Sequence, residues 1–301
     1  MKIIFKKQAV ILLLLAVGTF KIATAQDVDL FKSQDEQDKK DKKNLTDYAT
    51  STFKTTRLIN GQSIENLGSG ILDVKISHRF DPVNEGAYTL FGLDNATMRM
   101  GVDYGVNKWL MVGVGRSTFE KTYDFFAKAR ILRQSKGKVN MPVSLSYAGS
   151  FIWKTIKDSK ITNYDDRFAY SHQLLIARKF NDYVSLQLMP TLVHYNLANS
   201  TQNDYYSLGV GGRLRLSRRV NLTSEYYYRF TKEAGYYNSL SVGFDIETGG
   251  HVFQFHFTNS TGMTDRTFIE ETSNKWGDGG VRFGFNIARV FTIVKPKEMK
   301  L

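Results

Sequence analysis

The sequence predicts an all-β fold: a closed, antiparallel transmembrane β-barrel of about 12 strands, with 10 to 14 compatible with the pattern. Three observations lead to this prediction. Segments between residues 71 and 292 alternate apolar and polar residues, the links between them switch between short and long, and an export signal precedes them. Side chains alternate sides along a strand, so one face of each segment meets lipid and the other meets an aqueous lumen.

The first 25 residues have the three parts of a secretory signal peptide. Three lysines within the first seven residues are followed by the apolar run Ala9 to Val17 and by Ala23-Thr24-Ala25. We expect cleavage between Ala25 and Gln26. A retained membrane helix is the weaker alternative, because the run is much shorter than the roughly 20 residues that a spanning helix needs.

Two segments precede the first strand, and we expect them to differ. Residues 26–50 are dense in charge and poor in large apolar side chains, which predicts a periplasmic tail or linker, with a partner-binding arm as the alternative. Residues 51–68 are less polar and show no clean period, so we expect a segment at the barrel mouth. The predicted division is a signal peptide at 1–25, a tail and barrel-mouth segment at 26–68, and the barrel at 69–301.

The first strand shows the alternation most clearly. In residues 71–80, Leu72, Val74, Ile76, His78 and Phe80 share one face, and Asp73, Lys75, Ser77 and Arg79 share the other. Eleven similar segments follow, at residues 96–104, 109–116, 122–132, 141–153, 167–180, 183–195, 205–216, 220–230, 238–246, 251–258 and 281–292. For residues 109–116 the sequence does not decide which alternate side chains face lipid. Trp109 and Met111 would lie on one face, and Leu110, Val112 and Val114 on the other.

The links support a membrane barrel, which has tight turns on the periplasmic side and longer loops outside. The short links are residues 105–108, 133–138, 181–183, 217–219 and 247–250. The longer links are residues 81–94, 117–121, 154–166, 196–204, 231–237 and 259–280. An even number of strands returns both ends of the barrel to the periplasmic side.

Charge and cysteine content exclude several classes of function. The formal net charge is +12, and removing a signal peptide with four lysines leaves about +8 (12 minus 4) on 276 residues (301 minus 25). The basic residues are scattered and the chain is exported, so nucleic-acid binding is a poor explanation. There is no cysteine, which excludes a disulfide, a thiol nucleophile and a thiolate metal site.

The histidines do not assemble a catalytic site by strand register. His78, His172 and His194 share faces with apolar residues, whereas His256 points inward with Gln254. Ser171 flanks His172 but faces the opposite side, so a serine hydrolase is disfavoured. We predict no catalytic residue, no cofactor and no metal site.

Two further motifs have a structural explanation that we prefer. The acidic residues of loop 259–280 (Asp265, Glu270, Glu271 and Asp278) could gather Ca²⁺, but we expect a flexible, solvated loop. Gly113 and Gly115 resemble part of a phosphate-binding loop, yet no helix follows them. Close packing or barrel curvature explains this pair better.

The inward faces of the strands predict a charged lumen. The residues expected there are Asp73, Lys75, Arg79, Arg99, Asp103, Asp124, Lys128, Arg130, Lys179, Arg213, Arg215, Glu225, Arg229, Asp245, Glu247 and Arg282. Ten are basic and six are acidic, so they can pair across the barrel and fill it. If a channel remains instead, the basic surplus predicts a weak preference for anions. The sequence favours neither alternative.

Residues 51–124 also resemble an uncharacterised β-barrel family of outer membranes in Bacteroidota. The resemblance rests on STFKTTRLINGQSIENL (51–67), GILDVKISHRF (70–80), LFGLDNATMRMGVDYGV (90–106) and LMVGVGRSTFEKTYD (110–124). It implies a barrel fold and an outer-membrane location over nearly all of the mature chain. The family is classed as a domain of unknown function, so it assigns no catalytic or binding residues.

The sequence thus predicts an outer-membrane protein that acts as a small passive channel or transporter without catalysis. Expected partners are outer-membrane lipid, a small polar or anionic solute and a periplasmic protein, and no nucleic acid. Two alternatives remain: a non-conducting scaffold or docking protein, and an integral-membrane hydrolase.

Overall fold

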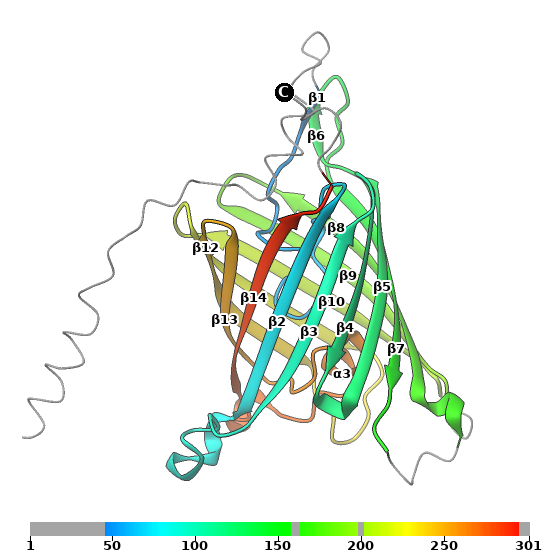
Figure 1. Ribbon diagram of the computed structural model, residues 1–301, viewed down its shortest axis with the longest axis vertical. Coiled ribbons are helices and arrows are strands. Elements are labelled where there is room, and N and C mark those ends of the chain that lie inside the picture. The colour runs from blue at the N-terminus through cyan, green and yellow to red at the C-terminus, as the bar shows by residue number, and fades with distance from the viewer. Residues whose placement is uncertain (1–45, 158–162, 198–201, 295–301) are drawn as a thin grey trace, which may run out of the picture.

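A computed structural model describes residues 46–157, 163–197 and 202–294. Twelve antiparallel strands form a closed barrel, in which β14 pairs with β2 (Figure 1). In chain order the barrel strands are β2 (Ile71–Pro82), β3 (Ala96–Gly105), β4 (Leu110–Ser117), β5 (Thr122–Leu132), β7 (Ser144–Lys154), β8 (Phe168–Lys179), β9 (Val184–Tyr195), β10 (Asp204–Arg215), β11 (Val220–Arg229), β12 (Ser239–Thr248), β13 (His251–Thr258) and β14 (Arg282–Thr292). The predicted fold class is confirmed, and the twelve predicted segments match these strands to within three residues at each end. The predicted signal peptide, with its cleavage site at Ala25 and Gln26, lies outside the described residues.

The two ends of the barrel differ as the link lengths predicted. Short turns gather at the upper end in Figure 1, where the chain enters and leaves the barrel and Ile293 N–H donates to the Gly70 carbonyl (2.9 Å). There β1 (Thr46–Tyr48) pairs with β6 (Ser135–Gly137) as a separate two-stranded sheet. Longer links occupy the other end, except that residues 118–121 between β4 and β5 are short. The link predicted at 133–138 is also longer than expected, because it runs over residues 133–143 and contains β6. Because long loops lie outside and tight turns lie in the periplasm, the upper end is the periplasmic one.

The helices of the described residues are short and lie in the links. They are η1 (Val83–Glu85), η2 (Ala87–Thr89), η3 (Phe119–Lys121), η4 (Tyr164–Arg167), α3 (Asp265–Ile269) and η5 (Trp276–Asp278). Within the described part of the chain, no helix is long and apolar enough to cross a bilayer.

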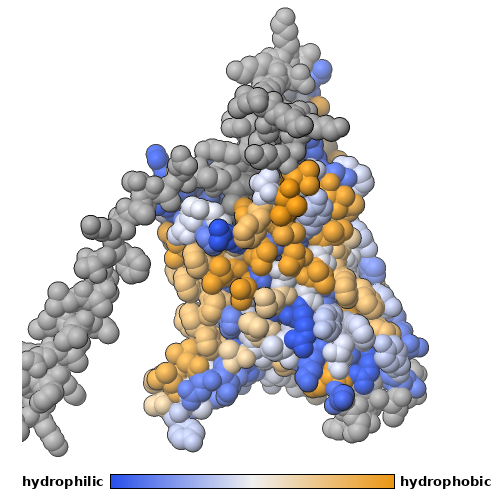
Figure 2. Space-filling model, in the orientation of Figure 1, coloured by the Kyte–Doolittle hydropathy of each residue, from blue (hydrophilic) through white to orange (hydrophobic). Residues whose placement is uncertain are grey.

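The alternation of side chains follows the predicted faces. On β4, Met111 is buried, whereas Val112 and Val114 are exposed on the outer surface, which decides the question that the sequence left open. Figure 2 shows hydrophobic residues spread over the outer face of the barrel, with hydrophilic residues gathered toward the loop end. Such an outer band faces lipid.

Two glycines of β4 make room inside the barrel. A Cβ atom at Gly113 would lie 2.2 Å from a ring carbon of Phe126, and one at Gly115 would lie 2.1 Å from a guanidinium nitrogen of Arg99. Both glycines therefore allow large side chains of the lumen to lie against the strand, and the prediction of close packing is confirmed.

Candidate functional site

The lumen is occupied by residues 51–68, which we call the internal segment. Almost all of its side chains are buried, including Phe53, Leu58 and Ile64. The sequence placed this segment at the barrel mouth, but the structure places it within the barrel. Because wall residues surround the segment on all sides, its sequence lacks the alternation of apolar and polar residues that identifies the barrel strands.

The centre of the internal segment is a tight hairpin. Leu58 N–H donates to the Gly61 carbonyl (2.8 Å), and Ser63 N–H donates to the Thr56 carbonyl (3.0 Å). A Cβ atom at Gly61 would lie 2.1 Å from the Tyr227 hydroxyl, so the tip needs glycine for its close approach to the wall. Sequence reasoning missed this hairpin, although Asn60-Gly61 is a strong turn signal.

A carboxylate from the wall binds the hairpin tip. Glu225 of β11 accepts hydrogen bonds from the backbone N–H groups of Ile59 (3.3 Å), Asn60 (2.8 Å) and Gly61 (3.0 Å). Glu225 is buried, and several N–H donors are what an ionised carboxylate needs away from water.

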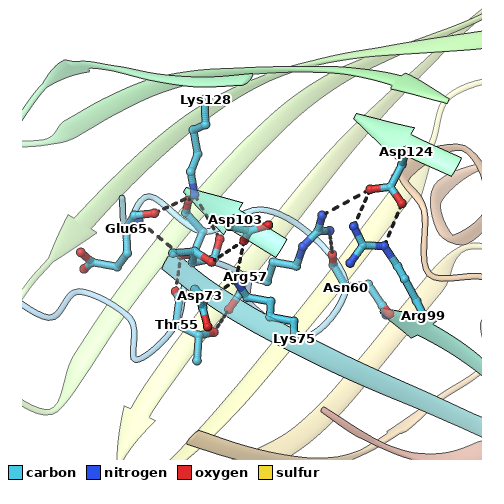
Figure 3. A network of polar contacts seen from close by, with 12 residues as sticks. Thr55, Arg57, Asn60, Glu65, Asp73, Lys75, Arg99, Asp103, Asp124 and Lys128 are labelled. Atoms are coloured by element: carbon cyan, nitrogen blue, oxygen red, sulfur yellow. Dashed lines mark hydrogen bonds and ion pairs between the residues drawn. The ribbon is translucent and has the colours of Figure 1, made fainter. Parts of the chain in front are cut away.

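An ammonium group from the wall binds the open end of the same hairpin. Lys128 of β5 is fully buried, and its Nζ donates to the carbonyls of Thr56 (3.1 Å), Ser63 (2.9 Å) and Glu65 (2.6 Å) (Figure 3). These three bonds use all the donors of the ammonium group. The hairpin is therefore held at both ends by wall charges of opposite sign.

Near the hairpin, wall charges pair with one another. Lys75 binds Asp73 (2.5 Å between Nζ and Oδ2) and also Asp103. Arg99 makes a two-pronged contact with Asp124, at 2.9 and 2.5 Å (Figure 3). Pairing of lumen charges across the barrel was one of the two alternatives that the sequence left open. The Lys75–Asp103 and Arg99–Asp124 pairs each join two strands. Asp73 and Lys75 lie on the same strand.

The internal segment is joined to these pairs by Arg57. Its guanidinium lies 3.9 Å from the Asp124 carboxylate and packs over the Phe126 ring at 5.4 Å. Arg57 also donates to the Asn60 carbonyl (2.9 Å), which stabilises the hairpin. Sequence reasoning did not place Arg57 in the lumen, because it lies outside the strands.

The structure brings most of the predicted lumen residues inside the barrel. Twelve are buried: Asp73, Lys75, Arg79, Arg99, Asp103, Asp124, Lys128, Arg213, Glu225, Arg229, Asp245 and Arg282. Arg130, Lys179, Arg215 and Glu247 are partly exposed near the periplasmic ends of their strands.

Several of these residues bind the internal segment directly. Arg79 donates to the Asn60 side chain (2.8 Å), and Arg213 donates to the Ser51 carbonyl (2.6 Å). Near the periplasmic mouth, Glu247 pairs with Lys54 (2.5 Å), and Lys179 donates to the carbonyl of Thr50, the residue just before the segment (3.2 Å). Basic and acidic wall groups thus fix the segment along its whole path.

The remaining predicted residues have local partners. The Asp245 carboxylate accepts from Thr223 (2.6 Å) and Gln254 (2.9 Å). Arg282 pairs with Asp81 (3.1 Å) near the loop end. The guanidinium of Arg130 donates to the Lys108 carbonyl (3.1 Å), and that of Arg215 donates to the Ser217 carbonyl (3.2 Å).

A second insertion enters from the loop end. Residues 263–270 of the link between β13 and β14, which include α3, are buried inside the barrel. Asp265 accepts from Ser150 (2.8 Å), Glu270 pairs with Arg229 (2.6 Å), and Glu271 pairs with Arg266 (2.8 Å). The expectation of a solvated loop is wrong for residues 263–270, which are buried with Asp265 and Glu270 bound to partners within the protein, whereas Asp278 of the same link is exposed.

Burial affects the protonation of this inserted loop. It raises the pKa of Asp265, of Glu270 and of Glu271, because each carboxylate loses water on entering the barrel. The guanidinium groups of Arg229 and Arg266 oppose this shift only in part.

The two insertions meet in an apolar cluster at the centre of the lumen. Phe53, Leu58 and Ile64 belong to the same buried cluster as Phe268 and Ile269 of the inserted loop. The wall adds Tyr227, whose ring contacts Phe268 edge to face at 5.2 Å, together with Leu175 and Met189. The internal segment and the inserted loop therefore pack against each other inside the barrel.

His172 and His256 lie on the sides of the barrel wall that the sequence predicted for them. His172 lies on the outer surface, where its Nδ1 is 2.6 Å from the Tyr147 hydroxyl, whereas Ser171 is buried on the inner side. His256 is buried within the barrel. Ser171 and His172 therefore do not form a catalytic pair.

Similarity to known proteins identifies the fold family. The profile of a family described as a membrane bound beta barrel domain matches residues 53–291. No curated protein matches the chain.

Similarities to solved structures are remote. The NanC porin has a TM-score of 0.46 and 8% identity, covering 74% of this chain and 100% of that chain. The KdgM porin has a TM-score of 0.45 and 11% identity, covering 73% and 99%. An outer membrane channel from Pseudomonas putida F1 has a TM-score of 0.45 and 12% identity, covering 76% and 98%.

The closed barrel, its apolar outer band and its alternating links agree with this family description. Membrane-bound barrels with these features are of the outer-membrane type, which agrees with the localisation predicted from the sequence. The chain belongs to the family of membrane bound beta barrel domains designated DUF5777.

Proposed function

We propose that this protein is a passive channel or transporter of the outer membrane, in which the internal segment is a movable plug. The observation that carries the proposal is the attachment of that segment: Lys128 and Glu225 bind its hairpin through backbone groups, and no disulfide ties it to the wall, because the chain has no cysteine. The structure then represents the closed state.

The contacts that hold the plug in the barrel can break when the plug leaves and form again when it returns. When the hairpin leaves, water can solvate the freed charges of Lys128 and Glu225, which relieves the cost of burying them. The apolar side chains oppose release, because burying Phe53, Leu58 or Ile64 stabilises by about 1.5–3 kcal/mol each. The closed state is therefore favoured, and the open state is a less populated conformation that the protein reaches on its own.

The wall suits the passage of a polar solute. Beyond the charged residues, Gln173, Ser207 and Asn221 are buried and face the lumen, with side-chain N and O atoms that have no partner within the described protein. Such groups are stable when water reaches them. With ten basic and six acidic residues on the predicted lining, a small polar or anionic solute is favoured.

We also retain the expectations for the N-terminal part of the chain and for its origin. We propose that residues 1–25 are a signal peptide cleaved between Ala25 and Gln26, that residues 26–50 are a periplasmic tail, and that the chain comes from a member of the Bacteroidota.

A docking protein is the second candidate function. The observation that favours it is the small sheet of β1 and β6 outside the barrel, beside a polar cavity of about 330 Å³ lined by Asp47, Thr50, Lys136 and Asp182. This surface lies at the periplasmic end, where a periplasmic protein can reach it.

Solute flux separates the two functions. The full-length protein would be reconstituted into liposomes, and uptake of neutral, anionic and cationic solutes of increasing size would be measured. We expect passage of small solutes, with anions faster than cations of equal size. A folded barrel that passes none of them would reject the channel and leave the docking function.

A further inference from the structure

The outer face of the barrel carries an arginine at the loop end of β4. Arg116 is exposed and lies in register between Met100 of β3 and Tyr123 of β5. Its Nε donates to the Tyr123 hydroxyl (3.2 Å), and its guanidinium carbon lies 5.5 Å from the centre of the Tyr123 ring. No carboxylate of the described residues pairs with Arg116.

The position of Arg116 corresponds to the depth of lipid headgroups. The ring of its neighbour Tyr123 lies 6.0 Å from that of Trp153, and Trp153 lies 6.4 Å from Phe168. Tyrosine and tryptophan gather at the boundary between hydrocarbon and water. An arginine at this level can place its charge among headgroups, where a phosphate can neutralise it.

An apolar groove of about 220 Å³ begins at Arg116 and runs over the neighbouring strands. Its floor is a cross-strand row of valines, Val74, Val102 and Val114, which pair in register across β2, β3 and β4. The longer side chains of Met100 and Tyr123 also line it. Short side chains between longer ones leave a hollow on the lipid-facing surface.

We propose that this groove binds a phosphate-bearing lipid of the membrane leaflet on the loop side. An acyl chain lies over the valine row, and the phosphate binds the Arg116 guanidinium beside the Tyr123 hydroxyl. A guanidinium suits this role, because two of its N–H groups can donate to one phosphate. This inference does not depend on the proposed channel function.

Two other occupants fit the groove less well. A soluble anion would bind the charge but leave the apolar groove unfilled. A second copy of the chain, related by a two-fold axis through this patch, would bring Arg116 close to its own counterpart, where like charges repel. A lipid satisfies both the charge and the apolar surface.

Native mass spectrometry of the detergent-purified, full-length protein tests the site. The probes are phosphatidic acid, a diacylglycerol with the same acyl chains, and inorganic phosphate. The variants are Arg116→Gln, which removes the charge, and Val102→Phe, which fills the groove. Arg178→Gln is the matched control, because Arg178 is also exposed and packs over an aromatic ring, Phe180 at 5.2 Å, but lies outside the groove.

We expect phosphatidic acid to bind about tenfold more tightly than diacylglycerol, and Arg116→Gln to abolish this difference. Val102→Phe should weaken both lipids, and Arg178→Gln should change neither. Folding of each variant is checked by its compact electrophoretic migration before heating. The proposal is overturned if Arg116→Gln binds phosphatidic acid as the wild type does, if inorganic phosphate displaces the lipid at equal concentration, or if dimers form through the groove.

Discussion

Lys128 and Glu225 lie on nearly opposite sides of the barrel and bind the two ends of one hairpin. Going around the barrel, β5 and β11 are five strand steps apart one way and seven the other. The ammonium group binds backbone carbonyls, and the carboxylate binds backbone N–H groups. Each wall charge therefore meets the backbone dipoles of the opposite sign, and the hairpin is held without a direct salt bridge between the two residues.

Replacing Glu225 with glutamine should loosen the tip of the hairpin. The substitution keeps the size of the side chain but removes the charge that strengthens three N–H bonds, at an expected cost of about 1–3 kcal/mol. Single-channel recordings should show more frequent openings than in the wild type. Asp182→Asn in an exposed turn serves as control, and equal opening rates in both variants would contradict the role of Glu225.

Replacing Lys128 with methionine should destabilise the closed state more strongly. The Ser63 and Glu65 carbonyls lose their donor at once, and each unsatisfied group costs about 1–3 kcal/mol, whereas the Thr56 carbonyl keeps the N–H of Ser63. We expect residues 51–68 to become accessible to a protease while the barrel stays folded. Protection equal to the wild type would show that Lys128 does not hold the segment.

Acid should favour the closed position of the inserted loop. The pKa of Asp265, Glu270 and Glu271 is raised by burial, so these carboxyls bind protons more tightly inside the barrel than in water. The cost of burying their charges is present above the raised pKa values and is relieved as pH falls through them. Conductance should therefore decrease on acidification and depend less on pH in Glu271→Gln. Opening at low pH would contradict this sign.

Gly61 offers a steric test of the docked hairpin. Alanine at this position would place its Cβ 2.1 Å from the Tyr227 hydroxyl, so Gly61→Ala should displace the segment and lower the temperature of unfolding. Tyr227→Phe removes that hydroxyl and should restore part of the loss. Gly212→Ala is the control, because the nearest atom to its Cβ would be at an ordinary 3.4 Å. Equal effects of the two alanines would argue against a docked hairpin.

The twelve strands and their faces could be predicted because the membrane imposes one strict rule, lipid on one side and lumen on the other. Residues 71–80 show it directly, and the inward position of Lys128 follows from the same alternation. The contents of the lumen could not be predicted in this way. A wall residue such as Glu225 must be polar whether it faces water or the backbone of Asn60.

The internal segment also lacks the pattern that identifies strands. It is buried on all sides, and its few charges, such as Arg57, find partners only after the barrel closes. The turn signal Asn60-Gly61 and the scarcity of charge in residues 51–68 were the available signs. The burial of the inserted loop was not predicted for a related reason. Acidic residues such as Glu270 are usually solvated unless they pair with a buried arginine, as Glu270 does with Arg229.

A reversible lock between hairpin and wall tests the central claim, that the internal segment closes the lumen and must move for conduction. The Asn60 side chain lies 3.1 Å from Ser241 Oγ, and the chain has no cysteine of its own, so Asn60→Cys with Ser241→Cys can be joined by a short bifunctional thiol reagent. Ser241→Cys with Thr258→Cys is the matched control, because those side chains lie 2.9 Å apart on neighbouring wall strands. We predict that the first crosslink abolishes conductance in planar bilayers and that reduction restores it, while the control crosslink changes neither. Conductance that persists through the hairpin lock would contradict the account.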